Sequence, residues 1–295
     1  MTPLTVSVFP GGFNWPLFAG LDRGFFAAHG IALTIEQTAG SMAQMTDLAG
    51  GRFPIAMTAF DNIVAYVDGD GEAPIGAQPD FFAFLGSDDS FLSLVAAPGI
   101  ETIADLRGRR ISVDAATTGY AFVLYALLAQ AGIGSADYDL VRVGGMTQRW
   151  DDLKRGGCVA TLLSAPYDIL ARQDGFNVLA RADAVGPYQG NVAAACRPWA
   201  AANAGTVQGF IAAYVQSIEW LYAPQNKAQA CTVLQAHVPG LTDVMAAASY
   251  GVLLDPVRGF FRDGAIRADG VQTVLALRRQ YRPTGPAGGE IQRYT

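Results

Sequence analysis

Short β-branched segments alternate with helical segments along the first two thirds of the chain, and this alternation most constrains the fold. In the first series the predicted strands cover residues 4–9, 31–36, 55–58 and 81–85, and the predicted helices cover 15–29, 42–49 and 61–67. A series in which strands and helices take turns predicts a parallel or mixed sheet with helices packed on it.

A second series follows, and the last third of the chain has a helical pattern. The predicted strands of this series are 92–96, 111–113, 138–143, 159–163 and 178–180, with helices at 120–131 and 148–155. Strand 192–196 is predicted to return to the first unit, before helices at 206–222, 226–237, 243–251 and 268–281. The tail, 282–295, is rich in proline and glycine and is predicted to lie extended over the surface.

Two βα series in succession predict two lobes that face each other across a cleft. We expect the first lobe to comprise residues 1–87 and 191–295 and the second to comprise 88–190, with a hinge near 86–90 and 188–192. Several strands run into turns rich in Gly, Ser and Thr, which places small polar groups at the carboxyl ends of the sheets. Open α/β sheets bind ligands at that edge, so the cleft is the expected binding site.

The composition excludes some classes of partner. A formal charge of −6 argues against a nucleic-acid partner, because little positive charge is available to neutralise phosphates. No apolar run approaches the length of about 20 residues that a membrane span needs. The three cysteines are widely spaced and lack metal-ligand spacing, so we expect buried free thiols and no metal site.

The first residues, Met1 to Val8, enter a predicted strand without a basic segment or the apolar run of a secretory signal. We expect a periplasmic protein if a signal peptide was removed, and a cytoplasmic one if Met1 is the native start.

Several segments, in order along the chain, are similar to one family of solute-binding proteins. Residues 24–33, GFFAAHGIAL, match its G-F-F-x-x-x-G-(I/L)-x-(V/L) segment, and residues 103–113, IADLRGRRISV, carry its D-L-(K/R)-G-(K/R) motif before a strand. Residues 48–56, 119–132 and 156–160 add further similarity at the expected places. The chain resembles the periplasmic solute-binding proteins of ABC transporters in the sulfonate, taurine, nitrate and thiamine-pyrimidine (NMT1-like) group.

The resemblance implies a two-lobed type II periplasmic-binding fold, each lobe a mixed, mainly parallel sheet flanked by helices. It also implies capture of a small molecule by hinge closure and delivery to an ABC transporter permease. Two departures leave the subfamily open. Phe53 and Pro54 stand where the family has an acidic residue before the third strand, and Cys158 or Val159 stands where it has another.

Two predicted helix starts offer backbone amides to the anionic end of a ligand. The residues concerned are Thr117, Thr118, Gly119 and Tyr120 at one helix, and Ser41 and Met42 at the other. Free N–H groups and the positive end of the helix dipole favour a carboxylate, sulfonate or phosphate there, and the resemblance implies the same use. Thr117 or Thr118, and Ser41, are equally suited to cap their helices, so both interpretations remain open.

Aromatic and polar side chains follow other strands at the same edge. They are Phe13, Asn14, Trp15, Thr58, Phe60, Asp61 and Asn62 in the first lobe, and Ser164, Tyr167, Tyr188, Gln189 and Asn191 in the second. Trp15 would stack on a planar ligand or cover the first helix as a hydrophobic lid. Asp61 is as good a helix cap as a ligand partner. Arg149 is an anion partner or, more simply, a solvated helix residue.

A cleft rich in rings and hydroxyl groups and poor in charge favours a small aromatic or heteroaromatic acid, or an amide-like heterocycle. Enzymes also occur on this fold. A desulfinase would need a nucleophilic Cys in the first cleft loop, where Phe13 to Trp15 stand, and a thiamine-pyrimidine synthase needs Lys, His and Cys residues that are scarce here. We therefore expect a binding protein without a cofactor. The alternative is a cofactor-independent cytosolic lyase or hydrolase, in which a buried Asp61 would act as the acid.

Overall fold

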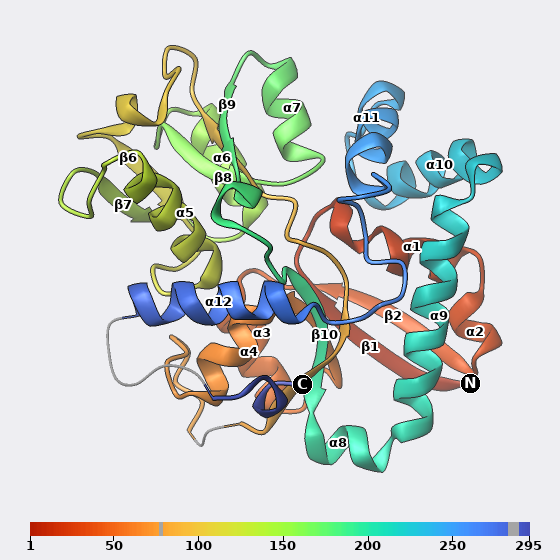
Figure 1. The fold of residues 1–295 in the computed structure, drawn as a ribbon. Helices are drawn as coiled ribbons and strands as arrows, with labels where there is room; N and C mark the ends of the chain where they lie inside the picture. The colour runs from red at the N-terminus through yellow and green to blue at the C-terminus, as the bar shows by residue number, and fades with distance from the viewer. Residues whose placement is uncertain (77–78, 283–288) are drawn as a thin grey trace.

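The computed structural model describes residues 1–76, 79–282 and 289–295, and it contains two five-stranded mixed sheets (Figure 1). The first sheet has the order β2 (Ile31–Gln37), β1 (Thr2–Val8), β3 (Ile55–Ala59), β10 (Asn191–Cys196) and β4 (Phe81–Gly86). The second has the order β7 (Asp139–Arg142), β6 (Arg110–Val113), β8 (Ala160–Leu163), β5 (Ser93–Ala96) and β9 (Asn177–Arg181). The fold is the predicted two-lobed α/β architecture.

Each sheet joins a parallel part to an antiparallel part. β1 pairs in parallel with β2 and β3, and Val6 faces Ile55 across the ladder. β10 runs antiparallel to β3 and β4, so the chain returns to the first sheet as predicted. In the second sheet β6 pairs in parallel with β7 and β8, whereas β5 is antiparallel to β8 and β9. Each sheet therefore consists of three parallel strands followed by one strand, β10 or β5, that runs antiparallel to both of its neighbours.

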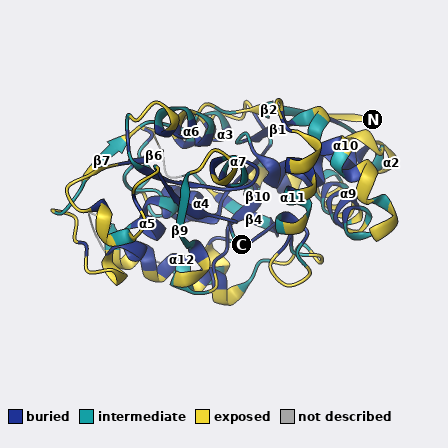
Figure 2. Ribbon diagram, turned by 90° about the horizontal axis from the view of Figure 1, so that it is seen from above, coloured by how far each residue is buried: buried dark blue, intermediate teal, exposed yellow. Residues whose placement is uncertain are grey.

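Helices cover both sheets. Those around the first sheet are α1 (Trp15–Asp22), α2 (Phe25–Ala28), α3 (Ser41–Ala49), α4 (Phe60–Val67), α8 (Arg197–Ala202), α9 (Ala204–Tyr222), α10 (Lys227–His237), α11 (Asp243–Leu253) and α12 (Ala268–Tyr281). Those of the second are α5 (Gly119–Gln130), α6 (Met146–Lys154) and α7 (Tyr167–Gln173). Short 3₁₀ turns are η1 (Gly12–Asn14), η2 (Ile103–Leu106), η3 (Ala182–Val185), η4 (Pro224–Asn226) and η5 (Ile291–Arg293). The central strands β3, β5 and β8 are buried, whereas β7 and β9 at the sheet edges are partly exposed, and Figure 2 shows exposed outer faces on the helices.

Two local features differ from the predicted elements. The predicted helix 15–29 is two helices, because Gly24 adopts a left-handed conformation with φ 73° between α1 and α2. Helix α7 was not predicted from the sequence, and it begins at Tyr167 directly after Pro166. Its position matters, because α7 packs on β5 and β9 of the second sheet.

The carboxyl-terminal tail was expected to lie extended over the surface, and this expectation is wrong for the part that the structure describes. Residues 283–288 lie outside the described residues. Beyond them, η5 leads to Tyr294, which is fully buried. The Tyr294 ring meets Phe60 edge-on at 6.3 Å between centroids, and its hydroxyl donates to Asp68. A large aromatic ring with a satisfied hydroxyl is stabilised by burial, which explains why the tail docks.

Helix α12 runs across the front of the molecule in Figure 1 and packs against α4 of the first lobe and α5 of the second. Its buried face includes Val271, Val274 and Leu275. On the same helix, Arg278 is only 1% exposed. The helix therefore braces both lobes on the side next to the cleft.

Candidate functional site

A cavity of about 50 Å³ lies where the carboxyl ends of the strands of both sheets meet. It is lined by Phe9, Phe13, Ser41, Ala59, Asn62, Ser90, Val113, Asp114, Thr118, Gly119, Tyr120, Ala121, Gly145, Met146, Arg149, Leu162, Ser164 and Asn191. These residues follow β1, β3, β6, β7 and β8, begin α3, α5 and α6, or belong to the crossing segments. The position agrees with the general rule for open α/β sheets.

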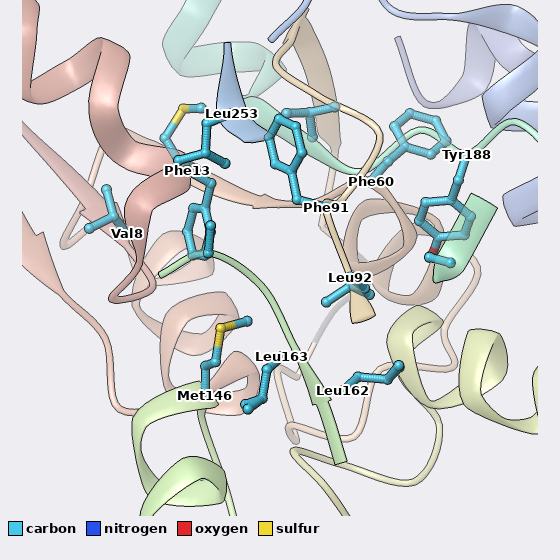
Figure 3. Packing of buried hydrophobic residues seen from close by; sticks show 14 of the residues in the cluster. Val8, Phe13, Phe60, Phe91, Leu92, Met146, Leu162, Leu163, Tyr188 and Leu253 are labelled. Atoms are coloured by element: carbon cyan, nitrogen blue, oxygen red, sulfur yellow. The ribbon is translucent and has the colours of Figure 1, made fainter. Parts of the chain in front are cut away.

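Apolar side chains form much of the wall. Figure 3 shows the Phe13 ring, from the loop after β1, pointing towards Met146 at the start of α6, so that the two lobes meet across the cavity. Ser164 is bound to the same methionine, with its N–H and its hydroxyl 3.4 and 3.3 Å from the Met146 sulfur. A mainly apolar wall with a few polar groups is typical of small-molecule sites.

Direct bonds close the two lobes over this cavity. The Gly12 N–H, in the loop after β1, donates to the Ala165 carbonyl after β8 at 3.1 Å. The Ser41 N–H at the start of α3 donates to the Asp114 Oδ2 after β6 at 3.3 Å. On one flank, Glu72 accepts from the Thr117 N–H and hydroxyl at 2.9 and 2.6 Å. The structure is therefore a closed conformation.

Both predicted helix starts border the cavity, but the chain's own carboxylates occupy part of each. Asp114 holds the Ser41 amide of α3, and Glu72 holds the Thr117 amide before α5. Thr118 caps α5 by accepting from the Ala121 N–H at 3.5 Å. Gly119 and Tyr120 line the cavity at the α5 start. Met42 is 42% exposed and does not line the cavity.

Arg149 is a buried residue and not the solvated helix residue that the simpler interpretation favoured. It is 5% exposed, lines the cavity, and donates from Nη1 to the Leu162 carbonyl at 2.9 Å and to the Thr161 hydroxyl at 3.3 Å. Its Nε has no hydrogen-bond partner. Burial lowers the pKa of its guanidinium, and the charge of Asp114 acts in the opposite direction. The sequence of α6 is mostly polar, which suggests an exposed helix, but Arg149 and the adjacent Trp150 are both buried.

Trp15 does not reach the cavity, so the stacking interpretation is corrected. It is fully buried within the first lobe, where its Nε1 donates to the Ala230 carbonyl at 3.0 Å and its ring meets Tyr250 edge-on. Asn14 likewise supports the loop, because its amide donates to the Phe9 and Gly11 carbonyls. Of this predicted trio, Phe13 alone lines the cavity.

Asp61 neither caps α4 nor faces the cavity. Its carboxylate forms a bidentate ion pair with Arg278 of α12, at 2.8 Å from Nε to Oδ1 and 2.6 Å from Nη2 to Oδ2. Both side chains are essentially inaccessible, at 0% and 1% exposure. The same guanidinium donates to the Thr117 carbonyl of the second lobe at 3.2 Å. The pair therefore joins α4, α12 and the segment before α5.

Of four more predicted site residues, one lines the cavity and three lie away from it. Asn62 lines the cavity and donates to the hydroxyl of the buried Thr58 at 2.9 Å. Phe60 packs on Tyr294. Tyr167 lies off the cavity, with its hydroxyl 3.2 Å from that of Thr147.

Tyr120 and Tyr188 stand beside the α5 start, with ring centroids 6.4 Å apart. Tyr120 lines the cavity, whereas Tyr188 lies behind it. Burial raises the pKa of both phenols far above the ordinary value, and nearby carboxylates add to the shift. Both phenols are therefore neutral hydrogen-bonding groups at physiological pH. The Tyr188 hydroxyl has no partner.

The crossing segments between the lobes contain a buried carboxylate network. Asp88 is fully buried and accepts from the Ser90 N–H, the Asn191 N–H and the Asn191 side-chain amide. Burial raises the pKa of Asp88, and these hydrogen bonds oppose that shift. Gln189 is buried beside it and accepts from the Arg267 N–H before α12. Asn191 and Ser90 line the cavity, and the Ser90 hydroxyl is unpartnered.

The first of the two segments that connect the lobes also has an unusual backbone conformation. Ser90 has φ 86° and Phe91 has φ 52°, both in the left-handed region that favours glycine. Such residues persist where the surrounding structure holds them in place, and they concentrate at ligand sites and switch regions.

Sequence reasoning missed Asp114, Ser90 and Met146 as cavity residues. Asp114 could have been found by the rule already in use, because it directly follows strand β6 at its carboxyl end. Among the residues described, no group of three or more His, Cys, Asp or Glu side chains is placed to hold a metal ion. The described helices include none that is both long and apolar enough to cross a membrane.

A family model described as NMT1/THI5 like matches residues 14–228, which is more than half of the chain. Comparison with curated proteins found no match.

Solved structures share the whole fold. A protein from Bordetella bronchiseptica RB50 is 20% identical with a TM-score of 0.83, and the match covers 100% of this chain and 94% of that one. The alkanesulfonate-binding protein SsuA from Xanthomonas axonopodis pv. citri, bound to MOPS, is 16% identical with a TM-score of 0.78, covering 96% and 95%. The periplasmic nitrate-binding protein NrtA from Synechocystis PCC 6803 is 12% identical with a TM-score of 0.72, covering 92% and 74%. These likenesses establish the fold.

Proposed function

We propose that this chain, which belongs to the NMT1/THI5-like family, binds a small organic solute between its lobes and delivers it to an ABC-type importer. The observation that carries the proposal is the closed cavity, to which both lobes contribute apolar walls and convergent polar groups. The alkanesulfonate-binding and nitrate-binding proteins that share the fold support it, since their names record small-solute binding.

The lobes proposed for this function are residues 1–87 with 191–295, and residues 88–190. The strand pairing supports this division, because β10 joins the first sheet and β5 to β9 form the second. The hinge would lie near 86–90 and 188–192. The positive φ angles of Ser90 and Phe91, and the Asp88–Asn191 network between the two crossing segments, support this place for the hinge.

In the proposed cycle the lobes separate, admit the solute and close. Closure would restore the Gly12–Ala165 and Ser41–Asp114 bonds and exclude water from the cavity. A polar contact made in such an enclosed site is stronger than in water, which favours retention of a matched solute. An importer receives its solute on the outer side of the membrane, so the proposed function belongs in the periplasm.

The enzymatic alternative depended on Asp61 as an acid in the cleft. Its carboxylate is held by two guanidinium bonds from Arg278 and does not line the cavity. The carboxylate that does line the cavity, Asp114, accepts from the Ser41 N–H, so we propose binding and not catalysis.

The test is retention of a solute by the purified protein. We would incubate it with a pooled panel of carboxylates, sulfonates, amino acids, pyrimidines and small amides, and read retained masses by native mass spectrometry. The proposal expects an unchanged ligand, retained less well by Phe13→Leu and equally well by Met42→Ala, whose exposed side chain lies off the cavity. A product mass that grows with time, or no retention of any compound, would overturn it.

A further inference from the structure

We propose that the solute is a small zwitterion, with a carboxylate bound by Arg149 and an amine bound by Asp114. This inference rests on the proposed function and specifies the ligand of the same cavity. Asp114 and Arg149 are the only charged side chains among the described residues that line the cavity. Asp114 is negative and Arg149 is positive, so the cavity offers one partner for a cationic group and one for an anionic group.

Among the described residues no carboxylate is in direct contact with Arg149, although the charge of Asp114 acts on it from across the cavity. Arg149 is 5% exposed and is in no ion pair with a carboxylate of the described residues. Its Nη1 donates to a neutral carbonyl and a neutral hydroxyl, and its Nε has no hydrogen-bond partner. A buried charge is unfavourable unless it is paired and hydrogen-bonded. A carboxylate matches the planar fork of a guanidinium, so it would satisfy this group on binding.

The start of helix α5 also favours the carboxylate end of the solute. Gly119 and Tyr120 begin α5, a helix of twelve residues, and both line the cavity. The positive end of its dipole adds to the attraction for an anion. The start of α3 does not serve in this way, because its Ser41 amide already donates to Asp114.

Asp114 makes a purely anionic solute a poor fit. Its Oδ2 accepts from the Ser41 N–H at 3.3 Å, and its Oδ1 accepts no hydrogen bond from the part of the chain that the structure describes. An anion without a positive group would enter beside this carboxylate with no compensation for the repulsion. An ammonium group at the other end of the solute would instead pair with Oδ1.

The size and walls of the cavity indicate a short aliphatic linker. At about 50 Å³ the closed cavity has room for a small solute only. Phe13, Met146 and Leu162 supply apolar surface between the polar groups. Small amino acids and ω-amino acids combine these properties.

The test is isothermal titration calorimetry with compounds matched in length. We would compare 4-aminobutyrate with butyrate and butylamine, and repeat the comparison for glycine, β-alanine and 5-aminovalerate with their single-charge analogues. The inference expects at least one zwitterion to bind ten-fold or more tightly than both of its analogues. Equal or tighter binding of the anion would overturn the inference and leave solute binding intact. Failure of every compound in the native mass spectrometry panel would instead overturn the proposed function.

Substitutions of Asp114 and Arg149 test the role of each charged residue separately. Asp114→Asn keeps an acceptor for the Ser41 amide and should reduce the preference for the zwitterion over butyrate to less than three-fold. Arg149→Gln should abolish binding of both the zwitterion and butyrate, because each would lose the partner of its carboxylate. The matched controls are Asp174→Asn and Arg155→Gln, exposed residues of the second lobe that lie off the cavity, and these should bind as the wild type does. An unchanged zwitterion preference in a folded Asp114→Asn protein would overturn the assignment.

Discussion

At the residue scale, the Asp61–Arg278 pair shows how a predicted ligand group became a structural one. The two residues are 217 positions apart in the chain, yet they form two short hydrogen bonds at nearly zero exposure. Replacement of Asp61 leaves the buried Arg278 with only the longer carboxylate contact to Asp70 among the described residues, 3.6 Å from Nη1 to Oδ2, and loss of a close buried pair costs far more than loss of a surface pair.

Asp61→Asn should therefore lower the free energy of unfolding by about 3–5 kcal/mol. The control is Asp151→Asn, which breaks the exposed pair with Lys154 and should cost about 0–1 kcal/mol. Urea denaturation followed by circular dichroism measures both. A loss for Asp61→Asn no larger than that of the control would show that the pair contributes little.

Asp89, beside the buried Asp88 in the segment between β4 and β5, should make stability depend on pH. Burial first, and the charge of Asp88 second, raise the pKa of Asp89 to about 6, above the ordinary value of about 3.9 in an unfolded chain. The folded protein therefore binds a proton on the Asp89 carboxylate more tightly than the unfolded chain does. The associated stability is complete below pH 4 and is lost as the pH rises through 6.

Relative to the wild type, Asp89→Asn should gain stability as the pH rises from 4 to 7. The measurement is the difference in the free energy of unfolding between the two proteins, from urea denaturation at pH 4, 5, 6 and 7. A difference that stays constant over this range would contradict the expected titration.

At the scale of elements, the start of α5 packs tightly against Asp61 of the first lobe. A Cβ atom on Gly119 would lie 2.3 Å from the Asp61 Cβ and 2.6 Å from the Tyr188 hydroxyl. Glycine at the first position of α5 is thus required by the packing of the first lobe on this helix. Helix propensity alone would favour alanine there.

Gly119→Ala should destabilise the closed protein by about 1–3 kcal/mol, because backbone or lobes must shift to admit the methyl group. Gly251→Ala in α11, where a Cβ meets nothing within 4 Å, should instead stabilise by about 0.5–1 kcal/mol. Thermal unfolding compares the two, and effects of the same sign would refute the packing argument.

At the scale of the whole molecule, Glu72 connects the lobes on the flank of the cleft. It follows α4 of the first lobe, accepts two hydrogen bonds from Thr117, and pairs with Arg142 of β7 at 2.9 Å. Its partners both belong to the second lobe, so the contacts exist only while the lobes are closed.

Glu72→Ala should therefore shift the ligand-free protein towards an open form and enlarge its radius of gyration in small-angle X-ray scattering. The control is Glu219→Ala, an exposed residue of α9 whose loss should leave the scattering unchanged. Identical scattering from both variants would show that Glu72 does not hold the lobes together.

The sequence by itself determined the βα alternation and the return of β10 to the first sheet, and it predicted a site at the strand ends, where the structure has its cavity. These follow from short-range patterns, since strand and helix periodicities and strand-end turns are local. The similarity of the motif order to solute-binding proteins pointed to the same fold.

Only the tertiary structure decided which side chains meet at the cavity. Trp15 belongs to the core, Arg149 to the cavity wall, and Asp61 to an ion pair with α12, although all three stand where a ligand residue was plausible. Their roles depend on contacts with Ala230, Leu162 and Arg278, two of them more than 200 positions away in the chain. Local periodicity contains no information on such contacts, because they form only when the lobes fold and close.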